Sequence, residues 1–296
     1  MTEIRESEFD IEKIADSGQC FRMRKLPGDG DHNTDALKYE IIARDRRVIV
    51  TQFPGSFVLD CTENEYYSFW KSYFDIDTDT DYEMIRSLVD PKDEYLTKAV
   101  NTGYGIRILR QDFWEMIVTF LISQQNNIPR IHKCIDNICR EYGKGYAFPT
   151  PESLAHLDED DLMSCNLGYR SKYVVRAARS VVEGSLDLES ISRMDYPEAR
   201  EELLKIYGVG AKVADCICLF GLHHLEAFPV DTHIRQVLER EYGSGPTGGK
   251  EASNKRDASG LRNFGVGTDF PFERYGKYAG VIQQYIFYYE LHRPHM

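Results

Sequence analysis

Long apolar runs are missing from this chain of 296 residues. No stretch reaches the roughly 18 consecutive apolar residues that a membrane-spanning helix needs, so we expect no membrane span. The first residues, MTEIRESEFDIEK, mix both charges and lack the apolar centre of a secretory signal peptide. We therefore expect an intracellular protein, in the cytoplasm or nucleoid of a prokaryote or in the nucleus of a eukaryote.

Cysteine is too scattered for cross-links or a metal cluster. The seven cysteines are an odd number and are dispersed, which does not suggest a disulfide framework. Cys134 and Cys139 have no second pair at metal spacing, and Cys216 and Cys218 are separated by a single residue. This spacing favours reduced, mostly buried thiols over a structural metal.

Basic residues are in deficit, with 36 Lys and Arg against 48 Asp and Glu, for a net charge of −12. Taken alone, this balance argues against nucleic-acid binding. Acidic runs lie, however, in DIDTDTDYE (75–83) and LDEDD (157–161), which hold nine of the 48 acidic residues, whereas basic residues cluster at 130–133 and 169–179. Because local patches decide binding, the net charge does not exclude DNA.

The chain divides into a β-like part and a helical part. KYEIIARDRRVIVTQFPGSFVLD (38–60) contains short β-branched and aromatic runs, with a polar break at Arg44 to Arg47 and a turn at Pro54–Gly55, which predicts antiparallel strands. From about residue 91 the pattern is helical. We expect an α+β fold, with an N-terminal antiparallel β domain over 1–90 and helical domains over 91–296.

The predicted helices rest on apolar periodicity, on Pro at their starts and on Gly after their ends. A stretch rich in Gly, Ser and Lys predicts a flexible loop over 244–260. The predicted helices cover 63–75, 112–125, 129–143, 171–184, 196–208, 231–243 and, as one helix or a pair, 272–293.

KIYGVGAKVADCICLF (205–220) predicts a glycine hairpin that runs into an apolar helix, a helix–hairpin–helix over about 198–220. Gly208 and Gly210 allow a tight turn and close backbone approach. Backbone N–H groups at such a turn and helix start can bind a phosphate without reading sequence. Short Gly-x-Gly turns also occur as plain connections between helices. The motif alone therefore does not decide between phosphate binding and a plain connection.

Lys212 lies in the first turn of the predicted second helix. The positive end of the helix dipole and desolvation both favour the neutral amine, the form that attacks carbon. A surface lysine that contacts phosphate is the alternative. Asp231, in the segment 229–235, is either a plain helix cap or a carboxylate that stabilises a cationic sugar near the amine.

YGVGAKVADCICLF followed by PVDTH resembles the helix–hairpin–helix DNA glycosylases that have a Gly/Pro-rich loop and a closing aspartate. More narrowly, it resembles their 8-oxoguanine DNA glycosylase/AP lyase branch. The branch is indicated because further segments resemble it in the same order, namely DSGQCFRM (16–23), LISQQNNIPRI (121–131), NLGYRSKYV (166–174) and YAGVIQQYIF (278–287).

The resemblance implies a bifunctional base-excision repair enzyme without an organic cofactor. Lys212 would attack C1′, form a Schiff base and lead to β-elimination, and Asp231 would assist base loss. The expected substrate is 8-oxoguanine opposite cytosine in double-stranded DNA, with formamidopyrimidine-guanine as a second substrate. The protein would act as a monomer.

The resemblance also assigns the damaged-base pocket. The Gly18 carbonyl would accept a hydrogen bond from N7–H of the oxidised base, where guanine has only an acceptor. Gln283 would read the Watson–Crick edge and Phe287 would stack on the flipped base. Cys216 lies four residues after Lys212, on the same helix face, and would either wall the pocket or be a small core residue.

Around the opposite base, the resemblance implies that Tyr169 wedges the duplex. It implies that Arg130 and Arg170 contact the orphaned cytosine, and that Gln125 fills the vacated space, where the family usually has Asn. The longer Gln125 puts strictness for cytosine in doubt. His233, Gly208 and Gly210 would contact phosphates.

The resemblance also implies that the hairpin holds a monovalent cation, Na⁺ or K⁺, through the main-chain carbonyls of Leu204, Ile206 and Val209. Tyr207 occupies the usual position of a proline, which loosens the turn. Thr232 replaces an aliphatic residue, with little expected effect.

Two alternative functions are tested by particular features. An endonuclease III-like enzyme for oxidised pyrimidines shares the lysine and the aspartate, but no cysteine follows Cys218, so its iron–sulfur cluster is not expected. A non-catalytic helix–hairpin–helix DNA-binding protein would need neither Asp231 nor an aligned base pocket.

Overall fold

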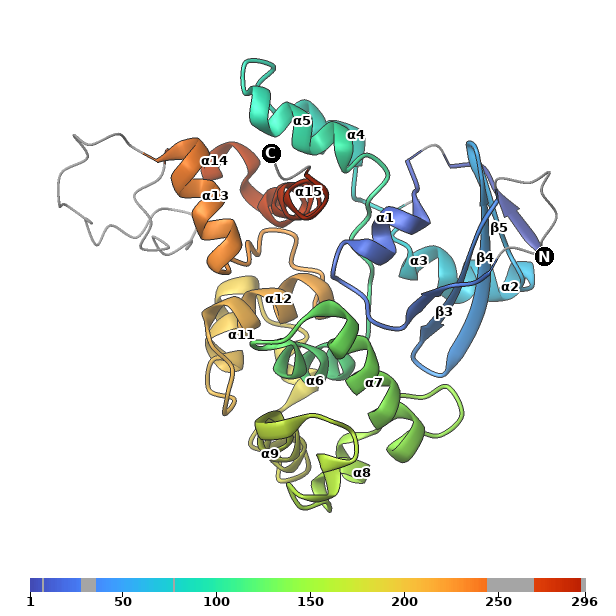
Figure 1. Cartoon of the computed structure of the whole chain (residues 1–296), viewed down its shortest axis with the longest axis vertical. Helices are drawn as coiled ribbons and strands as arrows, with labels where there is room; N and C mark the ends of the chain where they lie inside the picture. The colour runs from blue at the N-terminus through green and yellow to red at the C-terminus, as the bar shows by residue number, and fades with distance from the viewer. Residues whose placement is uncertain (7, 28–35, 77, 244–268, 294–296) are drawn as a thin grey trace.

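The computed structural model describes residues 1–6, 8–27, 36–76, 78–243 and 269–293. Figure 1 shows a sheet on one side of the molecule and helices in two groups beside it. None of the helices in these ranges is long and apolar enough to cross a membrane. The predicted loop over 244–260 lies outside the described residues.

The described part of the chain contains an antiparallel sheet with the strand order β1-β5-β4-β3-β2. Its central pair has the register Tyr39↔Val50 and Ile41↔Val48, and all four of these side chains are buried. The strands are β1 (Thr2–Ile4), β2 (Met23–Lys25), β3 (Leu37–Ala43), β4 (Arg46–Phe53) and β5 (Ser56–Leu59).

The two predicted turns of the sheet are both present. Pro54–Gly55 joins β4 to β5. The break expected over Arg44 to Arg47 is shorter, because Arg44 turns the chain with a φ of 53° and Arg46 already opens β4.

An aromatic core lies under the sheet. The predicted helix over 63–75 is present as α2 (Glu63–Glu65), a π-helical turn (Tyr66–Trp70) and α3 (Lys71–Tyr73). With α1 (Ile11–Asp16), these elements pack Trp70 and Phe74 against Phe57, and all three rings are buried. This packing closes the N-terminal sheet domain.

The helical part begins at α4, whose Tyr82 and Ile85 already belong to the second core. The residues of the first core lie before position 77, except for Leu109, which also packs in it. We propose that the domain division lies between residues 76 and 82, a little before the expected residue 90. The helices of this part are α4 (Tyr82–Ser87), α5 (Glu94–Thr102), α6 (Phe113–Ser123), α7 (Ile128–Tyr142), α8 (Pro151–Ala155), α9 (Ser171–Val182), α10 (Leu188–Ile191), α11 (Tyr196–Leu203), α12 (Ala211–Gly221), α13 (Thr232–Tyr242), α14 (Phe272–Tyr275) and α15 (Ala279–His292).

The helices form two groups in Figure 1. One group brings α4 and α5 beside α13, α14 and α15, and the Tyr95 hydroxyl donates to Glu290 at 2.9 Å across it. The other group contains α6 to α9, α11 and α12, with the buried α6 at its centre. The last predicted helix is a pair, because α14 ends before Gly276, which has a φ of 46°.

A buried ion pair connects the sheet domain to α6. Arg22, directly before β2, donates to Glu115 at 2.9 Å and also to the carbonyl of Tyr146. Both charged side chains are almost fully buried, and burial raises the pKa of Glu115 to about 7 although Arg22 opposes this shift. The arginine is therefore the group that makes an ionised Glu115 tolerable here.

We expect Arg22→Met to lower the free energy of unfolding by about 3–5 kcal/mol near neutral pH, because it leaves a buried carboxylate without its partner. A carboxyl whose pKa is raised by folding stabilises the protein below its unfolded pKa and loses that contribution as the pH rises. The destabilisation caused by Arg22→Met should therefore be smaller at about pH 5.5 than at about pH 8, as measured by urea-unfolding curves.

The double variant Arg22→Met/Glu115→Gln is the control for this effect. It should remove most of the pH dependence, because no ionisable carboxyl remains. A penalty for Arg22→Met that is equal at both pH values would contradict the proposed role of the pair.

Candidate active site

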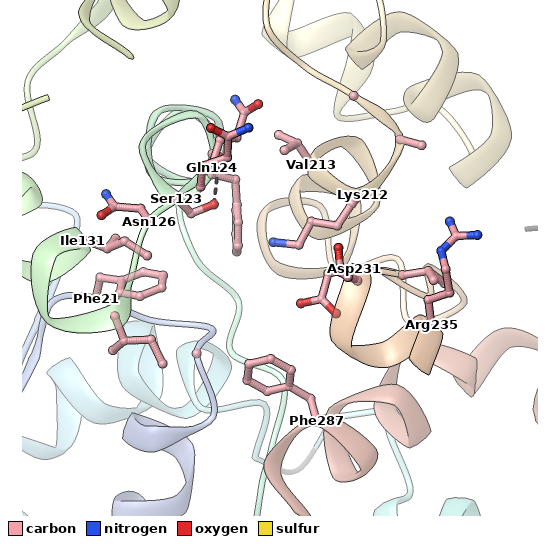
Figure 2. A pocket seen from close by; sticks show the side chains of 18 residues that line it. Phe21, Ser123, Gln124, Asn126, Ile131, Lys212, Val213, Asp231, Arg235 and Phe287 are labelled. Carbon is pink, nitrogen blue, oxygen red and sulfur yellow. Dashed lines mark hydrogen bonds between the residues drawn. The ribbon is translucent and has the colours of Figure 1, made fainter. Parts of the chain in front are cut away.

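Two adjoining cavities lie where α6, α12, α13, α15 and the loop after α1 meet (Figure 2). The larger has a volume of about 600 Å³ and the smaller about 50 Å³. Because five residues line both cavities, the smaller one forms an inner extension of the larger one. The residues that line both cavities are Gly18, Phe120, Lys212, Asp231 and Phe287.

The hairpin places Lys212 at the mouth of this inner cavity. α11 ends at Leu203, five residues before the predicted end, because the Ile206 amide bonds to the Leu203 carbonyl and the chain turns into the hairpin. α12 then begins at Ala211, so Lys212 is its second residue. Its amine lies 5.5 Å from the centroid of the Phe120 ring, and Figure 2 shows the side chain projecting into the cavity.

Asp231 is both a helix cap and a wall of the cavity. Its Oδ1 accepts the amide of Ile234 at 2.8 Å, which caps α13. Figure 2 shows its carboxylate turned into the same space as the Lys212 amine. The two functions considered for Asp231 are compatible, because the capping bond also fixes the orientation of the carboxylate.

The inner cavity is a narrow slot, and Gly18 and Phe287 both belong to its wall. Gly18 has a φ of +72°, and a Cβ built on it would lie 3.1 Å from the Phe287 ring. Gln283 on α15 is buried, and its Oε1 has no hydrogen-bond partner among the described residues. A buried amide oxygen of this kind is costly unless a ligand satisfies it.

Cys216 also lines the inner cavity, one helical turn after Lys212. Burial raises the pKa of the Cys216 thiol to about 11, although the nearby Lys212 opposes this shift. The side chain is therefore a neutral thiol at physiological pH and adds no charge to the wall of the cavity.

Glycine stands at the two hairpin positions for different steric reasons. A Cβ at Gly208, whose φ is +94°, would lie 2.6 Å from the ring of Tyr173. A Cβ at Gly210 meets no described atom within 4 Å, and Gly210 caps α12 without a side-chain bond. Position 208 thus needs glycine because the chain packs against Tyr173 there. At position 210, glycine leaves open space beside the unpaired amides of a helix start.

Gln125 lies at the rim of the larger cavity with a φ of 47°. Tyr169, which is 46% exposed, places its hydroxyl 3.4 Å from the Gln125 Oε1. Arg130 is exposed on α7 beside this loop. This arrangement suits a tyrosine wedge, and the contacts of these residues with DNA stay predictions.

Arg170 differs from the expectation. It is only 3% exposed, and its guanidinium donates to the carbonyls of Gln124, Gln125 and Leu167. Its donors are thus used within the protein, and in this structure the side chain fastens the loop after α6 instead of pointing to an orphaned base.

The remaining predicted contacts lie at the edge of the site. His233 is exposed in the first turn of α13 but lines neither cavity, whereas its neighbour Thr232 lines the larger one. At the hairpin, the Ile206 carbonyl accepts the Val209 amide at 2.9 Å, so a cation there would share this oxygen. Cation binding at Leu204, Ile206 and Val209 stays a prediction.

Two family models together match the chain from residue 1 to residue 259. They are the N-terminal domain of 8-oxoguanine DNA glycosylase over 1–117 and the HhH-GPD superfamily of base excision DNA repair proteins over 118–259. The structure of MBOgg1 in complex with a low-affinity DNA ligand is 33% identical, covers 97% of this chain and 94% of its own, and has a TM-score of 0.81. This chain belongs to the 8-oxoguanine DNA glycosylase family.

Other members of this family show the same similarity. The 8-oxoguanine glycosylase/lyase of Clostridium acetobutylicum, in complex with double-stranded DNA, is 36% identical over 96% of this chain and 92% of its own, with a TM-score of 0.80. The N-glycosylase/DNA lyase of Saccharomyces cerevisiae is 28% identical over 97% of this chain and 85% of its own. The family resemblance and the α+β fold are thereby confirmed.

Some lining residues were not among the predicted site residues. Phe120, which faces Lys212, comes from a helix that the sequence marks only as apolar. Arg235 is exposed, lines the larger cavity and lies one turn after Asp231 on α13. The four-residue spacing from Asp231 was a signal that could have identified Arg235, whereas Phe120 had none.

The two hairpin glycines form a matched pair for mutation. We expect Gly208→Ala to lower the free energy of unfolding by about 2 kcal/mol or more, because it combines a strained φ with a clash against Tyr173. Gly210→Ala should change it by less than about 0.5 kcal/mol. Thermal or urea unfolding of both variants measures the difference.

Duplex binding is the second measurement on these two variants. Gly210→Ala should weaken binding despite its normal stability, since the methyl group occupies the open space beside the helix start. Equal destabilisation by both substitutions would contradict the assignment of Gly208 to an internal contact.

Proposed function

We propose that this glycosylase removes 8-oxoguanine from double-stranded DNA and then nicks the abasic site. The observation that carries this proposal is the inner cavity, where the Lys212 amine and the unpaired Gln283 Oε1 meet at one slot. A nucleophile, a carboxylate and an unpaired polar group that can bind a base are parts that a bifunctional glycosylase needs. The similarity to glycosylase/lyases over nearly the whole chain supports it.

The chemistry begins with the neutral amine of Lys212. The amine attacks C1′, the C1′–N9 bond breaks, and the base leaves with the electron pair and takes up a proton. The sugar ring then opens to a Schiff base between Lys212 and C1′. Loss of a C2′ proton and breakage of the C3′–O bond expel the 3′ phosphate, and water releases the enzyme.

Asp231 assists the first of these steps. Positive charge develops on the sugar as the base departs, and a carboxylate held nearby stabilises it. The capping bond to Ile234 fixes one carboxylate oxygen, so the group is oriented before substrate binds. This pre-orientation avoids a reorganisation cost in the transition state.

Lesion recognition uses the slot. 8-Oxoguanine carries N7–H, a donor, whereas guanine has a bare N7 acceptor at the same place. A carbonyl at Gly18 would pair with the former and leave two acceptors facing each other with the latter, at a cost of about 1–3 kcal/mol. Gln283 would satisfy its Oε1 with donors of the Watson–Crick edge, and Phe287 would stack on the base.

The finer properties belong to the same proposal. The preferred opposite base is cytosine, with Gln125, Arg130 and Tyr169 around it, and formamidopyrimidine-guanine is the second substrate. His233, Gly208 and Gly210 contact phosphates, and the protein works as a monomer in base-excision repair. Arg170 supports the loop of Gln125 and reaches cytosine only if its internal bonds are exchanged.

We expect Lys212→Gln to abolish the borohydride-trapped adduct with an 8-oxoguanine duplex and to lower single-turnover cleavage by at least about 10³-fold, because no amine remains to attack C1′. Lys98→Gln, at an exposed position of α5, is the matched control and should trap and cleave as wild type does. The measurement is gel analysis of trapped and cleaved duplex.

Three outcomes of that experiment would oppose the proposal. An adduct that persists in Lys212→Gln would exclude Lys212 as the nucleophile. Cleavage of thymine glycol duplexes in preference to 8-oxoguanine duplexes would favour the oxidised-pyrimidine alternative. A wild-type protein that binds duplex but cleaves none would favour a non-catalytic DNA-binding function.

Gln125 should relax the preference for cytosine, and Gln125→Asn should tighten it. The shorter amide fits closer to the orphaned base, and Asn adopts the observed positive φ more readily than Gln. We expect the ratio of cleavage opposite cytosine to cleavage opposite adenine to rise by about tenfold, the usual effect of one methylene in a fitted pocket. Duplexes with each of the four opposite bases measure the ratio, and an unchanged ratio would contradict this role.

A further inference from the structure

The turn that carries Gly18 is held on both sides. The Ser17 carbonyl accepts a hydrogen bond from the side-chain amide of Gln284. The Gln19 carbonyl accepts one from the side chain of Gln111 at 2.8 Å. Between these two held carbonyls, no hydrogen bond within the described residues engages the carbonyl of Gly18. The turn is thus fixed at its flanks and leaves its central acceptor free.

Gln284 connects this turn to the helix that forms the other wall of the slot. It is only 2% exposed, it directly follows Gln283 on α15, and it precedes Phe287 by three residues. It also lines the inner cavity together with Ser17. One hydrogen bond therefore joins the helix that carries Gln283 and Phe287 to the loop that carries Gly18.

We propose that Gln284 is a positioning residue for lesion recognition, which sets the Gly18 carbonyl against the damaged base by holding the Ser17 carbonyl. This inference rests on the proposed function. Gly18 has a φ of +72°, and glycine backbones rotate easily because they lack a Cβ. If the Gly18–Gln19 peptide turned over, it would present an N–H in place of the carbonyl, which suits guanine and not 8-oxoguanine.

The structure therefore separates two kinds of glutamine on α15. Gln283 keeps an unsatisfied oxygen for the base, whereas Gln284 uses its amide within the protein. Loss of the Gln284 bond should disturb recognition of the base but not attack on a sugar that has no base. This difference gives a readout that a general loss of stability would not produce.

The test is Gln284→Met, which keeps the volume and removes the donor. We expect single-turnover release of 8-oxoguanine from a duplex with cytosine to fall about tenfold or more, since small misplacements of a recognition group have effects of this size. Cleavage of a duplex with a preformed abasic site should stay within about threefold of wild type, as Lys212 needs no base for this step.

Two further variants control the experiment. Tyr95→Phe removes another hydrogen bond to α15, the one to Glu290, away from the slot, and should leave both rates unchanged. Gln284→Glu can donate to the Ser17 carbonyl only when protonated. Its ratio of base release to abasic-site cleavage should therefore rise as the pH falls, while the same ratio for Gln284→Met should not.

The outcomes separate this inference from the proposed function. Equal losses of both rates in Gln284→Met, or no loss in either, would overturn the positioning role while wild type still releases 8-oxoguanine. A wild type that cleaves abasic sites but releases no 8-oxoguanine would overturn the proposed substrate, and the inference with it. A Gln284→Glu ratio that does not change with pH would also count against the role of the bond.

Discussion

The contact between Gly208 and the ring of Tyr173 is the constraint on which the site depends. A side chain at position 208 would lie 2.6 Å from that ring, so the hairpin can sit directly on α9 only because a glycine is there. This contact fixes where the chain turns, and therefore where α12 begins. Since Lys212 is the second residue of α12, the position of its amine follows from a steric contact on the far side of the hairpin. The exposed Tyr207 packs edge-on against Tyr173, with ring centroids 5.5 Å apart, and Arg176 covers it at 4.3 Å. In this chain, aromatic packing supports the turn that a proline would otherwise stiffen.

Two of the carboxylates that contribute to the negative net charge are buried and paired within the protein. Asp215, directly before Cys216, is buried and accepts from Tyr196 at 2.9 Å and from Arg200 at 2.5 Å. Asp75, in the first acidic segment, is buried and accepts from Tyr82 at 2.8 Å and from Arg110 at 2.9 Å. These carboxylates hold elements together and do not repel a phosphate backbone. Around the larger cavity, by contrast, the charged side chains are Lys212, Asp231 and Arg235. A compact acid beside two basic groups allows catalysis without making the cleft negative.

Most of the fold could be predicted from the sequence, because its signals are local. The turn at Pro54–Gly55, the cap at Asp231 and the apolar helix around Phe120 each follow from short-range chemistry. The C-terminal end of α11 could not be predicted, because its helical pattern continues into residues that the hairpin needs. The internal hydrogen bonds of Arg170 could not be predicted either. Its acceptors include the carbonyls of Gln124 and Gln125, some 45 residues earlier in the chain, and no motif records a side-chain bond to a distant backbone oxygen.

The last helix shows what sequence patterns leave undecided. α15 is buried on nearly all sides, so each polar residue on it needs a partner or a ligand. Gln283 and Gln284 are identical in type and adjacent, and nothing in their spacing tells them apart. Only the three-dimensional structure shows that one amide bonds to the Ser17 carbonyl while the other leaves an oxygen unpaired in a cavity. An unpaired buried acceptor is costly in the free protein, and we propose that substrate completes this one, because it lies in a cavity. Gln284, whose amide bonds to the Ser17 carbonyl, then holds the loop of Gly18 in position against the base.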